Sequence, residues 1–218
     1  MSSSAGRAGG DAAMDAAQRM PAGAQVAGDP SSWIVRWSHL IPPGGAVLDV
    51  AAGGGRNARW LAARGHRVVA LERDPAAIAA LGRMPGVDAL AADLEDGSPW
   101  PLPDDRRFSA VVVTNYLHRP LLPRLLAALG PGGILLYETF ARGNERVGKP
   151  SNPAFLLVPG ELLEAVRGTL RVIAFEDGFM PGPRQAFVQR ICAVREAAPV
   201  AANEAAESPA PMRYDLAG

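Results

Sequence analysis

Two short apolar runs on either side of a glycine-rich turn constrain the fold of this chain more than any other feature. Residues 46–50 and 67–72 have the length and β-branched content of buried strands, and the stretch between them has room for one helix. The turn contains Gly53-Gly54-Gly55, where the missing Cβ atoms let the backbone bend sharply and let a ligand approach the peptide groups. Asp49 lies near the end of the first run and Glu72 ends the second, about 20 residues later, the offset at which a βαβ unit places an acid over a ribose. The pattern predicts a nucleoside-binding βαβ unit.

The rest of the chain continues the alternation of strands and helices. Strands are expected at 46–50, 67–72, 87–92, 108–113, 134–140, 170–176 and 184–194. Helices are expected at 33–40, at 56–64 before Gly65, from Pro75 after an Asp74 cap, at 120–129 and at 161–167. The first of these helices should pack on the sheet edge or over the ligand. A Gly/Pro link at 178–183 suits a hairpin, so the last strand should be antiparallel. We predict an α/β, Rossmann-like, doubly wound, seven-stranded sheet that is mostly parallel.

Composition limits the domain organisation and the classes of partner. One globular domain at 30–195 is expected between disordered tails at 1–28 and 196–218, which lack a hydrophobic period. The 22 basic and 22 acidic residues balance, which disfavours a nucleic-acid partner. A single cysteine, Cys192, fits a reducing compartment, and the chain lacks both a secretory h-region and an apolar stretch of the ~20 residues that span a bilayer. We therefore expect a cytoplasmic protein that is not in the membrane.

Several motifs in order resemble the class I S-adenosylmethionine (SAM)-dependent methyltransferases over nearly all of 30–195. Gly53-Gly54-Gly55-Arg56-Asn57, followed by Leu61-Ala62 and by 65–70, is similar to the tellurite-resistance, TehB-like branch, in which a G-x-G-R-N turn is typical. The usual D-x-G-x-G-x-G pattern departs here at its first glycine, which is replaced by Ala51. An alanine fits that position if its backbone stays at negative φ.

The resemblance implies SAM as cofactor and assigns roles to individual residues. The carbonyls of Ala51 and Gly53 would receive the methionine amino group, with Asp49 holding the turn and Arg56 facing the methionine carboxylate. Glu72 would accept both ribose hydroxyls. Asp93 would receive the adenine amine, with Leu94 on the ring, and Asn115 would contact the cofactor through its backbone. The implied cofactor-binding set is Asp49, Ala51, Gly53, Gly55, Arg56, Asn57, Glu72, Asp93, Leu94 and Asn115.

The acceptor side is expected beyond the fourth and fifth strands, at the carboxyl ends where doubly wound folds bind ligands. Methyl transfer is an in-line displacement that needs mainly alignment and water exclusion. Tyr116 and His118 are the candidate catalytic residues, since an imidazole can accept a proton near neutral pH. The long polar loop at 141–153, anchored by 155–157, is interpreted as an ordered substrate lid rather than a solvated excursion. His39 and His66 lack partners at ligand spacing, so no metal is expected.

Methyl transfer to a small molecule is the leading interpretation, and three alternatives stay open. An RNA methyltransferase is disfavoured by the charge balance and by the absence of an N-P-P-[YF] motif at Asn115. A non-catalytic SAM-binding partner protein would keep Glu72 and Asp93 but need no base. A NAD(P)-dependent reductase would account for the G-x-G-x-x-A pattern that ends at Ala58, but its strand usually keeps the position of Asp49 apolar.

Overall fold

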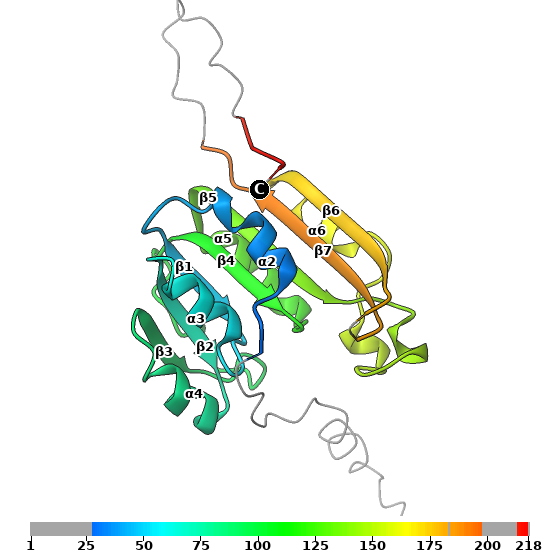
Figure 1. Ribbon diagram of the computed structural model, residues 1–218, viewed down its shortest axis with the longest axis horizontal. Coiled ribbons are helices and arrows are strands. Elements are labelled where there is room, and N and C mark those ends of the chain that lie inside the picture. Colours follow the sequence, from blue (N-terminus) through cyan, green and yellow to red (C-terminus); the bar gives the residue numbers. More distant parts are fainter. Residues whose placement is uncertain (1–27, 183, 198–212, 218) are drawn as a thin grey trace, which may run out of the picture.

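The computed structural model describes residues 28–182, 184–197 and 213–217, and seven strands in this part form one sheet (Figure 1). The strands are β1 (Ala46–Val50), β2 (Arg67–Glu72), β3 (Val87–Ala91), β4 (Phe108–Thr114), β5 (Leu129–Phe140), β6 (Arg171–Met180) and β7 (Ala186–Val194). The helices are α2 (Ser32–Trp37), α3 (Arg56–Ala62), α4 (Pro75–Leu81), α5 (Leu122–Ala127) and α6 (Glu161–Val166). Short 3-10 turns are η1 (Ser38–Leu40), η2 (Arg119–Leu121), η3 (Asn144–Arg146) and η4 (Pro153–Phe155).

The strand order β3-β2-β1-β4-β5-β7-β6 confirms the predicted doubly wound sheet. β1 pairs in parallel with both β2 and β4, so the chain reverses its direction of winding between β1 and β4. β7 is antiparallel to β5 and to β6, as predicted for the last strand. In open α/β sheets ligands bind outside the carboxyl ends of the strands where the winding reverses. The fold therefore places the candidate crevice beside the ends of β1 and β4.

Helices cover both faces of the sheet, and successive residues of each central strand face opposite layers. Val47 of β1 and Val112 of β4 pack with α2, α3 and α4, whereas Leu48 and Val113 pack with α5 and α6. This alternation accounts for the continuous apolar runs of the central strands, because both of their faces are buried. The polar edge of the sheet is the one formed by the carboxyl ends of the parallel strands.

The bounds of two strands and the position of one helix differ from those expected. β5 begins at Leu129 rather than at residue 134, so Pro131, Gly132 and Gly133 lie within the strand as a break in its register with β4, and Gly132 has a φ of 74°. β6 continues to Met180, which shortens the hairpin link. The prediction that the first helix packs on the sheet edge is wrong: α2 lies over the interior strand β5, and Trp33 Nε1 donates to the Ile191 carbonyl at 3.2 Å.

The predicted signals at the start of α4 and at the end of α3 are confirmed. Asp74 caps α4 by accepting from the amides of Ala76 and Ala77, and Gly65 adopts a φ of 86° after α3.

The predicted N-terminal tail lies outside the described residues except for Gly28. Of the predicted C-terminal tail, 196–197 and 213–217 are described, and Tyr214 packs against the α2 side of the core. Among the described helices none is long and apolar enough to cross a bilayer.

Candidate active site

The glycine-rich turn after β1 leads directly into α3 and leaves bare backbone at the switch point. A Cβ on Gly53 would meet no atom within 4 Å, whereas one on Gly55 would come within 2.5 Å of Leu81 Cδ2. Gly53 therefore faces open space that a ligand could use, and Gly55 is required by packing against α4. Ala51 has a φ of 53°, so the condition of negative φ under which an alanine fits that position is not met. The turn imposes a left-handed conformation that strains a residue with a Cβ.

Asp49 is a buried carboxylate with an unused oxygen beside this turn. Its side chain is 1% exposed, and Oδ2 has no hydrogen-bond partner among the described residues. Burial raises the pKa of Asp49 to about 7, and the Ala58 amide and the Arg56 charge only partly oppose this shift. A buried acceptor without a donor is costly, so this site is suited to a ligand that brings a cationic donor.

Glu72 ends β2 and holds the glycine turn in place. Its Oε2 accepts from the Gly53 amide at 2.7 Å, and its Oε1 accepts from the amides of Arg73 and Asp74 at 2.8 and 2.9 Å. A carboxylate has about four acceptor positions, so one position on Oε2 remains for a ligand hydroxyl. The same side chain thus shapes the turn and offers an acceptor to a ribose.

An open depression of about 520 Å³ lies outside the ends of β2 and β3. Its lining residues are Arg73, Asp74, Pro75, Ala91, Ala92 and Asp93. Asp93 Oδ1 accepts from the Glu95 amide at 2.9 Å, and Oδ2 lies 3.5 Å from Arg73 Nη1. Leu94 is half-buried and packs against the core. The volume is within the usual range for a small-molecule site, so the depression can hold a group the size of a nucleobase.

Two asparagines expected at the cofactor make internal contacts, Asn57 through its side chain and Asn115 through its backbone amide. Asn57 is 3% exposed, accepts from the Ser31 amide and donates to Thr114 Oγ1, both at 3.0 Å. Asn115 has a φ of 57° and donates its amide to the Glu138 carbonyl at 2.9 Å, while its side chain is exposed. Asn57 therefore has only its backbone available to a ligand, whereas Asn115 has its backbone carbonyl and its side chain available.

The residues after β4 form the wall that faces the acceptor side. Burial raises the pKa of Tyr116, and the nearby carboxylates of Glu95 and Asp93 add to the shift. The Tyr137 hydroxyl donates to the Tyr116 carbonyl at 2.9 Å and so holds this segment against β5. His118 is half-buried at the start of η2. A neutral phenol is a weak proton acceptor, so Tyr116 is better suited to shape the wall than to act as a base.

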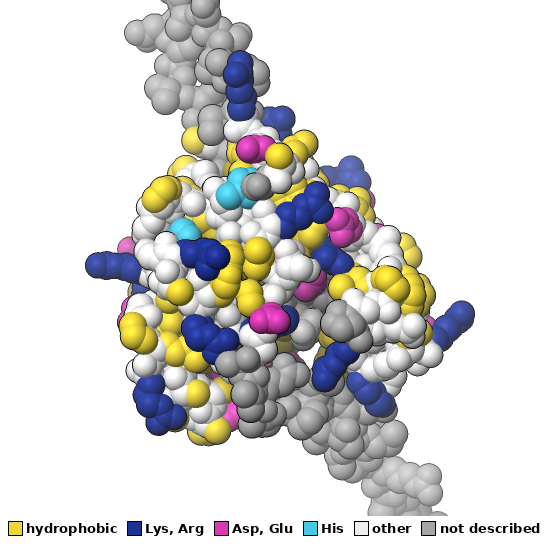
Figure 2. All heavy atoms as spheres, viewed as in Figure 1, with side chains coloured by type: hydrophobic (Ala, Val, Ile, Leu, Met, Phe, Trp, Pro, Cys, Tyr) yellow, Lys and Arg dark blue, Asp and Glu magenta, His cyan; other side chains and the backbone are white. Residues whose placement is uncertain are grey.

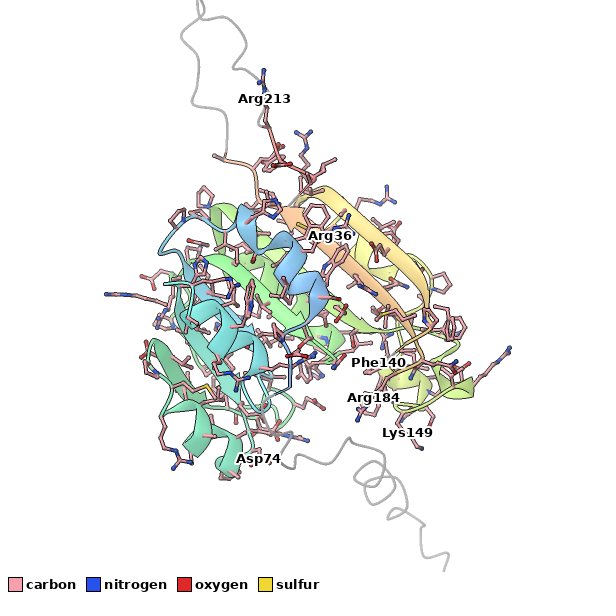
Figure 3. All side chains as sticks on the ribbon, viewed as in Figure 1. Arg36, Asp74, Phe140, Lys149, Arg184 and Arg213 are labelled. Atoms are coloured by element: carbon pink, nitrogen blue, oxygen red, sulfur yellow. The ribbon has the colours of Figure 1, made fainter. Side chains whose placement is uncertain are left out.

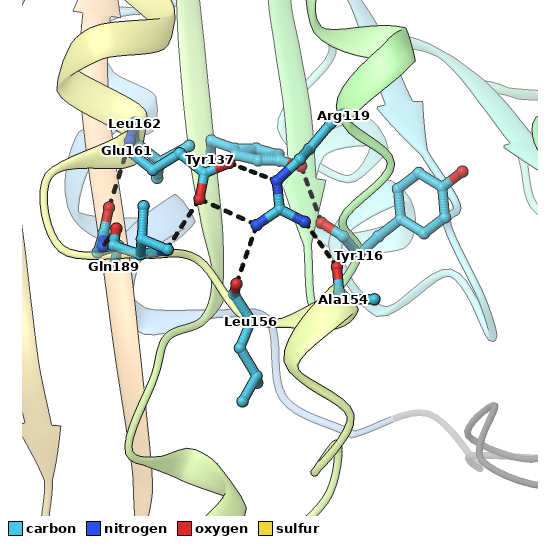
Figure 4. A network of polar contacts seen from close by, with 9 residues as sticks. Tyr116, Arg119, Tyr137, Ala154, Leu156, Glu161, Leu162 and Gln189 are labelled. Atoms are coloured by element: carbon cyan, nitrogen blue, oxygen red, sulfur yellow. Dashed lines mark hydrogen bonds and ion pairs between the residues drawn. The ribbon is translucent and has the colours of Figure 1, made fainter.

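Arg119 fastens this wall to the segment before α6, a contact that local sequence patterns do not predict (Figure 4). Its guanidinium contacts both carboxylate oxygens of Glu161 at 2.6 and 3.0 Å. It also donates to the carbonyls of Ala154 and Leu156 at 2.6 and 2.9 Å. Burial alone would raise the pKa of Glu161, but the bonds from Arg119 and the Val158 amide hold it below its usual value. Four directed bonds make Arg119 the anchor of this end of the loop.

The long loop after β5 is closed by its own contacts. Ala141 and Leu157 bridge at its base, and the Asn144 side chain, 1% exposed, donates to the Pro150 carbonyl at 2.9 Å. Its exposed cations are Arg142, Arg146 and Lys149, against the single acid Glu145. Arg184 of the β6–β7 turn lies with Lys149 at the end of the molecule where β5 finishes, and basic side chains gather there on the visible face (Figures 2 and 3). The interior contacts agree with an ordered loop, and its cations favour an anionic neighbour.

Comparisons with known proteins bear on this geometry. Residues 47–133, which contain the glycine turn, Glu72 and Asp93, match a family model described as a methyltransferase domain. The matched segment is thus similar to a methyltransferase domain. A trans-aconitate 2-methyltransferase from Methylobacterium nodulans is 31% identical over 140 residues, which cover 60% of this chain and 53% of the relative. The chain thus spans about half the length of that curated relative.

Solved structures of methyltransferases share the fold of this chain. TehB from Haemophilus influenzae superposes with a TM-score of 0.63 at 18% identity, covering 75% of this chain and 61% of TehB. The glycopeptide N-methyltransferase MtfA, solved with S-adenosylhomocysteine, superposes with a TM-score of 0.54 at 22% identity, covering 77% and 90%. The resemblance to class I methyltransferases is therefore confirmed for the fold.

The fold brings the predicted residues to one edge of the sheet but uses several of them for internal contacts. Asp49, Gly53 and Glu72 meet at the turn, whereas Arg56 Nη1 donates to the Asp29 carbonyl at 3.3 Å. Glu138, which ends up buried at the carboxyl end of β5, lies 3.2 Å from Arg190 Nε and accepts from Ser31. Sequence reasoning missed the roles of Ser31 and Arg190, because their partners are distant along the chain.

The cysteine and the histidine that could bind a metal or a substrate have structural roles instead. Burial raises the pKa of the Cys192 thiol to about 12, so this side chain is a core residue and no nucleophile. In the described part of the chain, no three His, Cys, Asp or Glu side chains are grouped so that they could hold a metal ion. His39 instead contacts the carbonyls of Arg36 and Asp215.

Proposed function

We propose that this protein is a SAM-dependent methyltransferase that acts on a small acceptor bearing a carboxylate. The observation that carries the cofactor assignment is the buried, unpartnered Oδ2 of Asp49 beside the bare backbone of Gly53. A cationic amino group would supply the donor that Asp49 Oδ2 lacks, and a ribose hydroxyl would donate to the open acceptor position of Glu72. The pyrophosphate of a dinucleotide is anionic and would supply neither donor.

The residues that would hold the cofactor follow from these settings. The Ala51 turn and Asp49 would take the methionine amino group, the open acceptor position of Glu72 a ribose hydroxyl, and the depression at Asp93 and Leu94 the adenine. When bound, SAM supplies an activated methyl group. The protein then contributes alignment of the acceptor and exclusion of water.

The bases that the site can supply limit the class of acceptor. The Tyr116 phenol is buried and neutral, and both Glu138 oxygens already have partners, Ser31 and Arg190. A carboxylate oxygen needs no base, because it is ionised at neutral pH. The cations of the loop at 142–149 would attract such an acceptor, and the relative from Methylobacterium nodulans is named for trans-aconitate. His118 keeps the role of a candidate proton acceptor for other nucleophiles.

We also propose a cytoplasmic location and no nucleic-acid partner. The single cysteine can form no intrachain disulfide, and the formal net charge of the chain is zero. The cations at the loop after β5 form a local feature suited to a small anion rather than to a nucleic-acid backbone.

Methyl transfer from labelled SAM tests this proposal. The full chain is incubated with trans-aconitate, a panel of other di- and tricarboxylates, their amides, and bulk RNA. Label in a base-labile carboxylate ester supports the proposal, and amides of the same acids should stay unlabelled. Label in RNA, or binding of SAM with no transfer to any carboxylate, would contradict it. Glu164→Gln, an exposed change on α6, serves as the control variant and should leave transfer unchanged.

A further inference from the structure

Residues 28–31, here named the strap, cross the carboxyl edge of the sheet just before α2 (Figure 1). Arg56 Nη1 donates to the Asp29 carbonyl at 3.3 Å, and Arg59 Nη2 donates to the Gly28 carbonyl at 3.4 Å. Both arginines belong to α3, and Arg56 is the first residue after the glycine turn. The strap therefore lies within one side-chain length of the turn that would hold the methionine end of the cofactor.

Ser31 is the residue that fixes the strap at its junction with α2. Its hydroxyl donates to Glu138 Oε1 at 2.9 Å and accepts from the amides of Trp33 and Ile34, so it also caps α2. Its own amide donates to Asn57 Oδ1 at 3.0 Å. Ser31 is 4% exposed, and Glu138 is 9% exposed. A buried carboxylate oxygen that loses its donor is costly, so these bonds hold the strap firmly.

The contacts continue on both sides of Ser31 as a chain of polar groups. On one side Asn57 donates to Thr114 Oγ1 at 3.0 Å, at the end of β4. On the other side Glu138 lies 3.2 Å from Arg190, which lies 3.7 Å from Glu176 of the edge strand β6. Glu176 in turn pairs with Arg36, in the last turn of α2, at 3.2 Å. These polar contacts thus pin α2 at both ends and place the strap beside α3, near the carboxyl end of β4.

We propose that the strap closes over the methionine end of the cofactor site, and that Ser31 is the positioning residue that holds it closed. This inference rests on the proposed function. With the strap bonded to Glu138 and Asn57, cofactor and demethylated product can leave only after these bonds break. Opening of the strap then limits product release, as segment opening does in many enzymes.

The dissociation rate of S-adenosylhomocysteine, followed by stopped-flow displacement from the full chain, tests the inference. Ser31→Ala should raise this rate about tenfold, because it removes one hydrogen bond to a charged group. Ser31→Thr, which keeps the hydroxyl, should restore the wild-type rate. Ser38→Ala removes a hydroxyl at the other end of α2, where it bonds only the Val35 carbonyl, and should leave the rate unchanged.

A second variant separates closure from capping of the helix. Glu138→Gln leaves the Ser31 oxygen free to cap α2 but weakens its bond to the side chain of residue 138, so it should also speed dissociation. Bound S-adenosylhomocysteine should slow amide hydrogen exchange at 31–35 in the wild type and less in Ser31→Ala. Equal dissociation rates in wild type, Ser31→Ala and Glu138→Gln would overturn the inference while leaving the proposed function intact. Absence of any S-adenosylhomocysteine binding by the wild type would instead refute the proposed function.

Discussion

At the scale of single residues, Asp49 makes the charge of the site depend on pH. Its pKa of about 7 in the folded protein lies well above the value near 4 expected in the unfolded chain. Ionisation of Asp49 therefore costs the folded state free energy, and this cost appears as pH rises from about 4 to about 7. A cationic amino group beside Oδ2 would favour the ionised form and recover that cost. Cofactor binding should then release a proton.

The affinity for S-adenosylhomocysteine should consequently increase with pH. If binding requires ionised Asp49, the dissociation constant should be about tenfold higher at pH 6 than at pH 8, with the curve levelling above pH 7. Calorimetric titrations across this range measure the profile. Asp49→Asn should bind more weakly and lose this dependence. A wild-type affinity that is flat between pH 6 and pH 8 would show that Asp49 does not face the amino group.

Ala51, in the same turn, has a strained backbone conformation. Its φ of 53° is one that a glycine adopts freely, so Ala51→Gly should raise the free energy of unfolding by about 1 kcal/mol. Ala52→Gly, one position on, is the matched control and should lower it by about 0.5–1 kcal/mol, since glycine gains chain entropy when unfolded. Urea denaturation of both variants gives the comparison. A destabilised Ala51→Gly would mean that the turn gains more from the methyl group than it loses in strain.

At the scale of elements, the predictable parts are those set by local patterns. β1, α3, β2 and α4 follow from apolar runs, the glycine turn and the Asp74 cap, all read within a few neighbouring residues. The fastening of loops does not follow from such patterns. Arg119 and Glu161 are 42 residues apart, and Ser31 and Glu138 are 107 apart. Only the folded sheet brings these pairs together, so the sequence indicates the crevice but not the segments that close it.

Arg119 should decide how well the segment before α6 is ordered. Arg119→Ala would leave Glu161 without its fork of donors and should lower the free energy of unfolding by about 1–3 kcal/mol. Arg119→Lys should recover only part of this, because an ammonium cannot make the same set of bonds. Amide hydrogen exchange at 154–158 should quicken in both. Arg167→Ala, which breaks a fully exposed pair with Glu164, should change the free energy of unfolding far less than Arg119→Ala and leave that exchange unaltered.

At the scale of the whole molecule, the sheet order brings separate functions to one edge. Under the proposed function, the ends of β1, β2 and β3 would supply the acids and bare backbone for a nucleoside, and the ends of β4 and β5 would supply the acceptor wall and the cationic loop. The strap lies beside α3, near the carboxyl end of β4. Both faces of the central strands are instead used for packing against helices. Cofactor and acceptor would therefore meet only at this edge.

A backbone amide NMR titration of the full chain with S-adenosylhomocysteine tests this account most directly. The account predicts saturable shifts at Gly53, at Arg73 beside Glu72, and at Leu94 beside Asp93, with little change at β6. Glu72→Gln should weaken the apparent affinity about tenfold or more, whereas Glu164→Gln should not. Saturation with shifts confined to another face of the sheet, or no shifts at millimolar ligand, would contradict it.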